Sequence, residues 1–512
     1  MAFTATVSAS PTTVPLKNTG VAFIRNDLAE RFVDYKLIQD CLAGSASVKS
    51  ARGIYLPMPD PSNTSEENFA RYEAYLTRAV FYNVTQRTAL GLQGQIFLRP
   101  PHIKTPATLE PVVTDSNGAG LSVEQLARDA EWFVASCGRA GLFIDYPPTD
   151  VAASKAQLEN GNIRPTISVY GPTSVVNWRE KSDGAKKFLS LVVLYETYTV
   201  EDDGFETKEG IQYRELRLGD DGVYTVQLWR AKDPDGDNFE KFGPPYVPKD
   251  GKGLPLKQIP FTFIGSKNNE PSIDPPPLLD LANINIAHYR NSADYEEMVY
   301  VVGQPMLVIS GLNKDWYEGV LCKKVPFGSR GGLPLPVGAT AELLQVLPNT
   351  AAFEAMGHKE RQMVALGAKI VEQRDVQRTA TEAGNETASE ESVLSAIAKN
   401  VSSAFQYALE WCAVFSNVPE DGIEFQLNDD FELSRMSPED INATIKSWQD
   451  GAISFTEMRV ILRKAGRATQ EDDVAKAEID ADATKAIEQA AAEIGATTKA
   501  VADNTPAEPA AV

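Results

Sequence analysis

The sequence PPPLLDLANINIAHYRNSADYEEMVYVV, residues 275–302, opens the stretch that decides the fold of this chain. A Gly/Pro-rich segment, QPMLVISGLNKDWYEGVLCKKVPFGSRGGLPLPVG (304–338), follows it and leads into NTAAFEAMGHKERQMVALGAK (349–369). A polar run, RTATEAGNETASEES (378–392), then precedes VLSAIAKNVSSAFQYALEWCAVF (393–415). In order, these segments predict a helix, a compact lobe, a returning helix, a polar break and a long helix. A chain that leaves along one helix and returns along another builds a stalk.

The composition limits the classes of protein to which the chain can belong. With 512 residues, of which 43% are hydrophobic, most of the chain is expected to fold around a sizeable core. A formal net charge of −21 argues against a protein that wraps nucleic acid by neutralising its phosphates. It leaves open a surface past which DNA slides, because like charge weakens contact. No apolar run reaches the roughly 18 residues of a membrane span, so no membrane partner is expected.

The chain before residue 275 predicts a body of mixed helices and strands. Residues 1–25 are rich in Ser, Thr and Pro and are expected to form an arm. Helices are predicted over 26–42, 65–97 (in two stretches) and 121–137. In the last of these, Ser122 can accept from the backbone of Gln125 while the Gln125 side chain reaches back, which is a capping box.

Residues 166–229 change to a period of two, which is typical of strands. The segments ISVYGPTSVVNW, FLSLVVLYETYTV, QYRELRL and VYTVQLW are β-branched and aromatic, and they predict an antiparallel meander. Further strands are predicted over 142–144, 259–264 and 423–427, the last of which should return to the same body. The predicted fold class is therefore α+β. After it we expect helices over 438–448 and 451–463 and an Ala-rich acidic tail from residue 471 that is partly disordered.

Residue types that carry catalysis or bind metals are sparse. The three histidines, His102, His288 and His358, do not lie at ligand spacing from one another. The cysteines form no CxxC pair, and Cys137 and Cys412 fall in apolar helical patterns that predict burial. The acidic run 233–237 lacks the glycine position and distal glutamate of an EF-hand, so we expect a turn there. We expect no catalytic residue, no cofactor, no metal site and no enzyme.

Basic residues gather in two places. Lys359, Arg361, Lys369, Arg374 and Arg378 lie along the returning helix or just after it. On one copy of the chain they can be a solvated helix face, whereas around a pore they would recur and make transient phosphate contacts. The basic residues of the lobe carry the same ambiguity, and they can instead face a protein partner.

Several short segments together resemble the portal proteins of tailed double-stranded-DNA bacteriophages, in a branch catalogued as a domain of unknown function. The resemblance covers roughly residues 25–465. The segments that carry it are YEAYLTRA (72–79), FYNVT (81–85), GRAGLFIDYP (138–147), YGPTSVVNW (170–178), IPF (259–261) through Asn268–Asn269, and TATE (379–382) with the helix after it. Their order and the stalk, rather than any one segment, are what make the chain similar to this family.

The resemblance implies a portal fold with an α/β wing, a helical stem, a small α/β clip, a long tunnel-loop helix and a helical crown. Laid onto this chain, its parts follow in order. They are an arm (1–25), the wing (26–274), stem helix 1 (275–302), the clip (303–348), stem helix 2 (349–372), the tunnel loop (373–391), the long helix with a returning wing strand (392–433), the crown (434–470) and its acidic tail (471–512).

The resemblance also implies a function and partners. The expected protein is a head–tail connector that forms a ring, usually of twelve copies, at one capsid vertex of the virion after assembly in the host cytoplasm. Implied partners are the terminase large subunit during packaging, head–tail adaptor proteins, major capsid and scaffolding proteins, and genomic double-stranded DNA that passes non-specifically. The alternatives are another ring or adaptor component of the virion, or a hydrolase that uses acidic clusters.

Two sets of site residues follow from this assignment. The candidate channel residues are Lys369, Arg374, Arg378, Thr379, Thr381, Glu382, Asn385 and Glu386. The candidate clip-interface residues are Lys314, Trp316, Lys323, Lys324 and Arg330.

Overall fold

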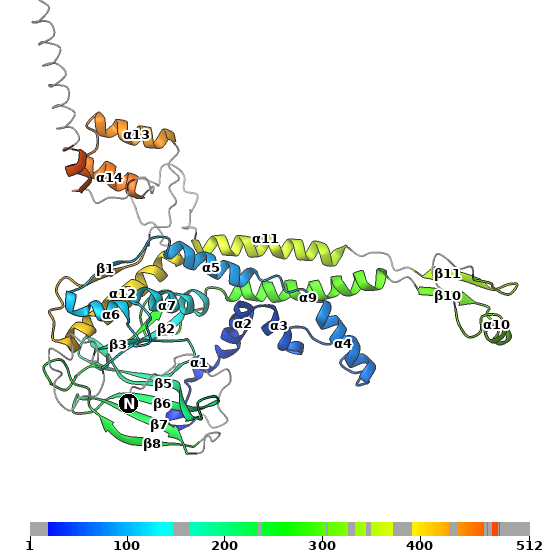
Figure 1. Ribbon diagram of the computed structural model, residues 1–512, viewed down its shortest axis with the longest axis horizontal. Helices are drawn as coiled ribbons and strands as arrows, with labels where there is room; N and C mark the ends of the chain where they lie inside the picture. The colour runs from blue at the N-terminus through cyan, green and yellow to red at the C-terminus, as the bar shows by residue number, and fades with distance from the viewer. Residues whose placement is uncertain are drawn as a thin grey trace, which may run out of the picture. The chain divides into compact units, whose positions relative to one another are not determined.

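The computed structural model combines helices and strands, so the chain is α+β. It describes residues 19–146, 164–232, 238–303, 306–325, 333–344, 350–371, 392–429, 438–464, 468, 474–479 and 481. The chain divides into two compact units, residues 1–429 and 430–512. Figure 1 labels the elements of both units.

The first unit begins with helices that pack on one another and on later helices. They are α1 (Asn26–Ala29), α2 (Phe32–Ala43), α3 (Ser45–Ser50), α4 (Glu66–Arg78), α5 (Val84–Ile96) and α6 (Glu110–Thr114). The helix predicted over 26–42 is thus interrupted, because the backbone turns at Glu30 and Arg31 between α1 and α2. The two helical stretches predicted within 65–97 are confirmed as α4 and α5.

Helix α7 (Val123–Cys137) forms as its start signal predicts. The Ser122 side chain accepts from the backbone N–H of Gln125, and the Gln125 side chain accepts from the backbone N–H of Ser122. The helix ends at Gly138, whose φ of 78° lies in the left-handed region. A Cβ at Gly138 would meet the carbonyl oxygen of Pro275 at 2.8 Å, so only glycine fits this close approach.

The strands that were predicted to form one meander fall in two separate sheets. Strand β2 (Arg139–Asp145) lies between β3 (Thr166–Tyr170) and β9 (Phe261–Gly265) in an antiparallel three-stranded sheet. The second sheet has five antiparallel strands in the order β4 (Val175–Asp183), β5 (Lys186–Asp202), β6 (Thr207–Leu218), β7 (Tyr224–Ala231) and β8 (Phe239–Tyr246). The prediction that 166–170 belongs to the meander is therefore wrong, because this strand pairs with β2.

A buried polar network joins the two sheets. Glu196 on β5 accepts hydrogen bonds from Tyr170 on β3, from Gln212 on β6 and from Arg214 Nε, each at 2.7 Å. Arg214 also contacts Asp145 on β2 at 3.2 Å. Burial alone would raise the pKa of Glu196, but Arg214 and these donors hold it below its ordinary value. Paired in this way, the buried charges fix one sheet on the other.

The first unit ends with a short strand, and helices follow in the second unit. Strand β1 (His102–Lys104) pairs antiparallel with β12 (Glu424–Gln426), so the strand predicted near 423–427 returns to the first unit as expected. The second unit contains α13 (Pro438–Gln449) and α14 (Phe455–Lys464), close to the helices predicted there. The acidic run 233–237 lies outside the described residues.

Candidate functional site

Two long helices, α9 (Leu279–Val302) and α11 (Ala351–Val371), lie side by side (Figure 1). His288 Nε2 lies 3.3 Å from Glu360 Oε1, and the rings of Tyr295 and Phe353 are 5.9 Å apart between centroids. From the first of these contacts to the second, the residue on α9 is seven positions later in the chain and its partner on α11 is seven positions earlier. The two helices are therefore antiparallel and in register over at least this length.

The first half of α9 is buried among the N-terminal helices. The side-chain oxygen of Asn285 accepts from the backbone N–H groups of Val84 and Thr85 and from the Thr85 hydroxyl. Its amide nitrogen donates to the Tyr82 carbonyl at 2.7 Å. Although Asn285 is a polar residue of the stalk, its side chain is fully buried because it satisfies the free N–H groups at the start of α5. Here a polar stalk residue serves packing within one chain.

Two further contacts hold the middle of α9 to α4. The Tyr75 hydroxyl donates to Asp294 at 2.6 Å, and Arg78 forms an ion pair with Glu297. Burial and the neighbouring Asp294 carboxylate together raise the pKa of Tyr75. These contacts anchor α9 near its centre.

On both sides of that anchor, the helical pair exposes apolar side chains. On α9, Val299, Tyr300 and Val301 are each between 43% and 46% exposed, and on α11 Phe353 is 60% and Val364 is 70% exposed. Aliphatic and aromatic surface gathered on one element of a protein marks an interaction site more often than scattered residues do. The surface of the helical pair is therefore suited to contact with another protein chain.

A small lobe connects the two helices. Strands β10 (Met306–Ser310) and β11 (Thr340–Leu344) form an antiparallel pair, and α10 (Lys314–Gly319) lies between them in sequence. Asn313 caps α10 by accepting from the Trp316 backbone N–H at 2.8 Å. The Trp316 indole donates to the Pro334 carbonyl at 3.0 Å, which ties α10 to the segment before β11.

The candidate clip-interface residues lie on this lobe, at and after α10. Lys314, Lys323 and Lys324 are exposed, whereas Trp316 is half-buried and serves to hold the lobe together. Lys323 lies 3.8 Å from Glu318, and its backbone has a φ of 60° at the turn after α10. Arg330 lies outside the described residues. The described lysines thus lie on the exposed surface of the lobe, Lys314 at the start of α10 and the other two in the turn after it.

The candidate channel residues follow α11. Lys369 belongs to the last turns of that helix. The other seven, Arg374, Arg378, Thr379, Thr381, Glu382, Asn385 and Glu386, lie outside the described residues.

The long helix α12 (Val393–Ser416) is tightly held after residue 392. Ser392 caps it by accepting from Ser395 at 3.1 Å. Asn400 donates to the Gly265 carbonyl at 2.8 Å, and Gln406 both accepts from Phe425 N–H and donates to the Ile423 carbonyl. Apart from Val393, which is 42% exposed, the apolar stripe predicted for this helix is buried, Cys412 included. A helix fixed by polar contacts to both β9 and β12 is a rigid support for the residues before it.

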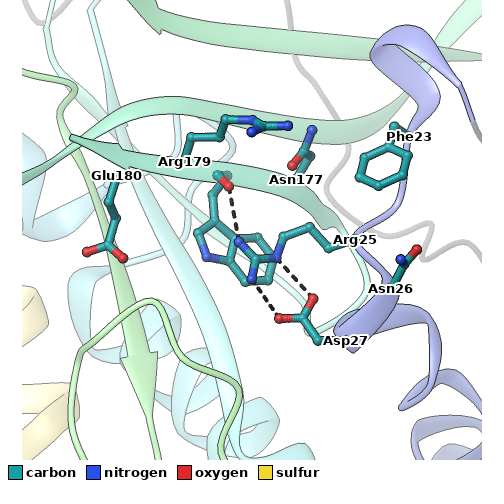
Figure 2. A pocket seen from close by; sticks show the side chains of 8 residues that line it. Phe23, Arg25, Asn26, Asp27, Asn177, Arg179 and Glu180 are labelled. Carbon is teal, nitrogen blue, oxygen red and sulfur yellow. Dashed lines mark hydrogen bonds and ion pairs between the residues drawn. The ribbon is translucent and has the colours of Figure 1, made fainter.

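A groove at the edge of the five-stranded sheet was not predicted. It is an open pocket of about 610 Å³ lined by Phe23, Arg25, Asn26 and Asp27 before and within α1 and by Asn177, Trp178, Arg179 and Glu180 on β4. The Arg25 guanidinium lies 4.1 Å from the centroid of the Trp178 ring and pairs with Asp27 at 2.7 Å (Figure 2). Its two halves are some 150 residues apart in the chain, so no local sequence pattern could reveal it.

The described part of the chain contains neither a cluster of metal ligands nor a membrane span. Within those residues, no group of three or more His, Cys, Asp or Glu side chains is arranged to hold a metal ion. None of the described helices is both long enough and apolar enough to cross a bilayer.

Comparison with known proteins gives one partial family match. Residues 277–416, about a quarter of the chain, match the family described as "Domain of unknown function (DUF4055)". No curated protein matches. Among solved structures, a chain from "Neck of empty GTA particle computed with C6 symmetry" is similar with a TM-score of 0.40 and 14% identity over 75% of this chain and 90% of that one. A chain from "Virion of native gene transfer agent (GTA) particle" gives 0.36 and 14% over 76% and 92%. The family match begins just before α9 and ends with α12.

Proposed function

We propose that this chain is a portal protein, the head–tail connector of a tailed double-stranded-DNA phage or a related particle. Copies of the chain form a ring, usually of twelve, through which terminase drives DNA into the capsid and through which the DNA later leaves. The observation that carries the proposal is the antiparallel pair α9 and α11, joined through a small lobe and followed by the rigid helix α12. The family match covers this same run of elements.

The surface of the helical pair supports assembly into a ring. Apolar residues near the C-terminal end of α9 and along α11 are exposed in the single chain, and exposed apolar surface is stabilised when a neighbouring copy covers it. A contact that uses different surfaces of the two copies repeats around an axis and closes into a ring when the rotation allows it. In the proposed ring, α9 and α11 form the stem and the lobe of β10, α10 and β11 forms the clip.

The arrangement around residues 373–391 supports a channel. This polar segment lies between α11 and α12, and α12 is fixed to β9 and β12 by hydrogen bonds. In the proposal the segment is the tunnel loop, held by a support that does not yield when DNA moves past it. The net charge of −21 suits such a passage, because a strongly basic wall would hold the phosphates.

The lobe is the proposed docking site for the portal's partners. Its exposed lysines, Lys314, Lys323 and Lys324, would contact terminase during packaging and head–tail adaptor proteins afterwards. The wing, residues 26–274, would face the major capsid and scaffolding proteins at the vertex of the virion.

The first test is the mass and shape of the purified protein. We expect particles near twelve times 55.8 kDa that appear as discs with a central hole in negative-stain images. Val299→Glu, which places a charge on the exposed face of α9, should shift the protein from rings toward single chains. Val33→Glu is the matched control, because Val33 is also an exposed helical valine but lies on α2. A wild-type chain that remains a monomer at micromolar concentration would contradict the proposal.

A further inference from the structure

The hairpin between β5 and β6 carries a fully exposed aromatic side chain. Phe205 is 102% exposed at the turn, where it makes no use of its apolar surface in the single chain. The backbone N–H groups of Glu206 and Phe205 both donate to Asp203 Oδ1, at 2.6 and 2.8 Å, and Gly204 N–H donates to Asp202 Oδ1. These bonds hold the pKa of the Asp203 carboxyl below its ordinary value. The turn is thus preorganised around an aromatic group that projects into solvent.

The charge of this hairpin is strongly negative. Residues 199–209 contain five acids and one base, and all of them are exposed. Among exposed side chains, a large aromatic group within a charged rim resembles the anchor of a protein interface, where aromatic residues supply most of the binding energy. The surface that receives this hairpin should therefore combine an apolar hollow with basic residues.

The groove toward the other end of the same sheet is open and is lined by Phe23, by Arg25 and Arg179, and by the acids Asp27 and Glu180, with the buried Trp178 beneath Arg25. About 150 Å³ suffices for a benzene ring, well below the groove's volume of about 610 Å³. Asp27 pairs with Arg25, so the excess of basic charge comes from the segment beside the groove. Figure 2 shows Phe23 and Arg179 on two sides of the hollow, with Asn177 between them. The adjoining segment 179–187, which includes the β4–β5 turn, contains four basic and two acidic residues.

The floor of the groove is rigid. Trp178 is stacked between two guanidinium groups, since Arg25 lies 4.1 Å from its ring centroid and the buried Arg139 lies 3.9 Å from it. Arg139 in turn lies 4.2 Å from the ring of Phe263 on β9. The Trp178 ring is itself buried, so an incoming aromatic side chain meets the Arg25 guanidinium, which Trp178 and Asp27 hold in a preformed position.

The hairpin and the groove cannot meet within one chain. Trp178 is paired with Val192 on β5, and the strand runs on from there to Asp202. Ten extended residues span roughly 30 Å, so the two sites face opposite ends of the sheet. Complementary sites at opposite ends of one molecule join copies head to tail, which is the kind of contact that closes a ring.

We propose that Phe205 of each copy inserts into the groove formed by Phe23, Arg25, Trp178 and Arg179 of the neighbouring copy. This contact joins wing to wing around the ring, in addition to the contacts of the helical pair. It rests on the proposed ring, because a heterologous contact of this kind satisfies both of its sites in every copy only when the assembly closes.

Disulfide trapping tests the contact directly. Cys322 is exposed and is first replaced by serine, whereas the other three cysteines are buried and stay. Copies carrying Phe205→Cys are then mixed with copies carrying Asn26→Cys at the rim of the groove, assembled into rings and oxidised. We expect a cross-linked dimer in the mixture and none from either variant alone. Leu254→Cys, at an exposed loop position outside the hairpin, replaces Phe205→Cys in the control mixture.

A second measurement does not depend on the introduced cysteines. Phe205→Ser should raise the protein concentration at which half of the chains are in rings by about tenfold or more, as truncation of an interface anchor does. Leu254→Ser should leave this concentration unchanged. Circular dichroism checks that the monomer of each variant is folded. We expect the fold to be intact, because each substitution replaces an exposed side chain.

The outcomes separate this inference from the proposed function. Rings that form normally with Phe205→Ser, without a disulfide in the mixture, would overturn the inference and leave the portal proposal standing. Normal rings that fail only to join capsid subunits would assign Phe205 to the capsid protein and would equally overturn it. A wild-type chain that never forms rings would instead defeat the proposed function, and the inference with it.

Discussion

Glu131 is a carboxylic acid with no exposed surface on the buried side of α7. Its Oε2 accepts from Gln93 at 3.0 Å, and its Oε1 is buried without a hydrogen-bond partner. Burial raises the pKa of Glu131 to about 8, and the contacts with Gln93 and Arg128 offset only part of the effect. The side chain is therefore protonated in the folded protein at neutral pH, while the unfolded chain, with its ordinary pKa near 4.5, has released the proton.

This difference makes stability depend on pH. Between the unfolded and folded pKa values the folded state binds more protons, so the free energy of unfolding falls as pH rises, by up to about 1.4 kcal/mol per unit. Glu131→Gln removes the titration, so its stability relative to wild type should increase from pH 5 to pH 8. Urea unfolding at several pH values measures this. Glu124→Gln, at the partly exposed first turn of the same helix, is the control, and an equally flat profile for both variants would contradict the assignment.

Among the elements, those determined by near neighbours in sequence were predicted and those determined by distant partners were not. The capping box of α7 and the buried stripe of α12 depend on residues a few positions apart. Strand β1 pairs with a strand more than 300 residues away, and β8 is an edge strand whose sequence contains two prolines that an interior strand would reject. The burial of Asn285 depends on partners at the start of α5 that are 200 residues away, so no local pattern indicates it.

The same distinction applies to the candidate sites. The lobe and its lysines are contiguous in sequence, so a candidate interface could be predicted there and stays a prediction, whereas the groove of Arg25 and Trp178 joins two distant segments and was not predicted. Which of the channel residues face a pore depends on the arrangement of neighbouring copies, and a single sequence does not contain that arrangement.

The capping box of α7 provides a prediction at the scale of one element. Ser122→Ala leaves the Gln125 N–H without its acceptor and should lower the free energy of unfolding by about 1 kcal/mol. Ser122→Gly loses the same hydroxyl but should cost only a few tenths of a kcal/mol, because glycine is tolerated at the N-cap. Urea unfolding of the two variants compares them. Equal losses would mean that the backbone preference for glycine at the N-cap, and not the lost hydrogen bond, has been misjudged.

For the whole molecule, the balance of charge decides how DNA would pass. With 70 acidic and 49 basic residues, the chain has a net negative charge that repels a DNA duplex. The few basic residues near the proposed channel are therefore expected to make most of its contacts with DNA phosphates. Lys369 belongs to the end of α11, and Arg374 and Arg378 follow it in the first part of the proposed tunnel loop. Around a ring they would provide a band of brief phosphate contacts within an otherwise repulsive wall.

Reversing these three charges together should impair packaging without preventing assembly. With glutamate at Lys369, Arg374 and Arg378, the wall becomes uniformly repulsive, so we expect intact rings in negative stain, shorter packaged DNA and reduced infectivity. The matched control reverses Lys232, Lys252 and Lys257, which are exposed lysines of the wing and change the net charge by the same amount. Because the two triple variants carry equal total charge, a loss confined to the first depends on position. Unchanged DNA length in both variants would mean that the three residues are merely solvated and that DNA passes without touching them.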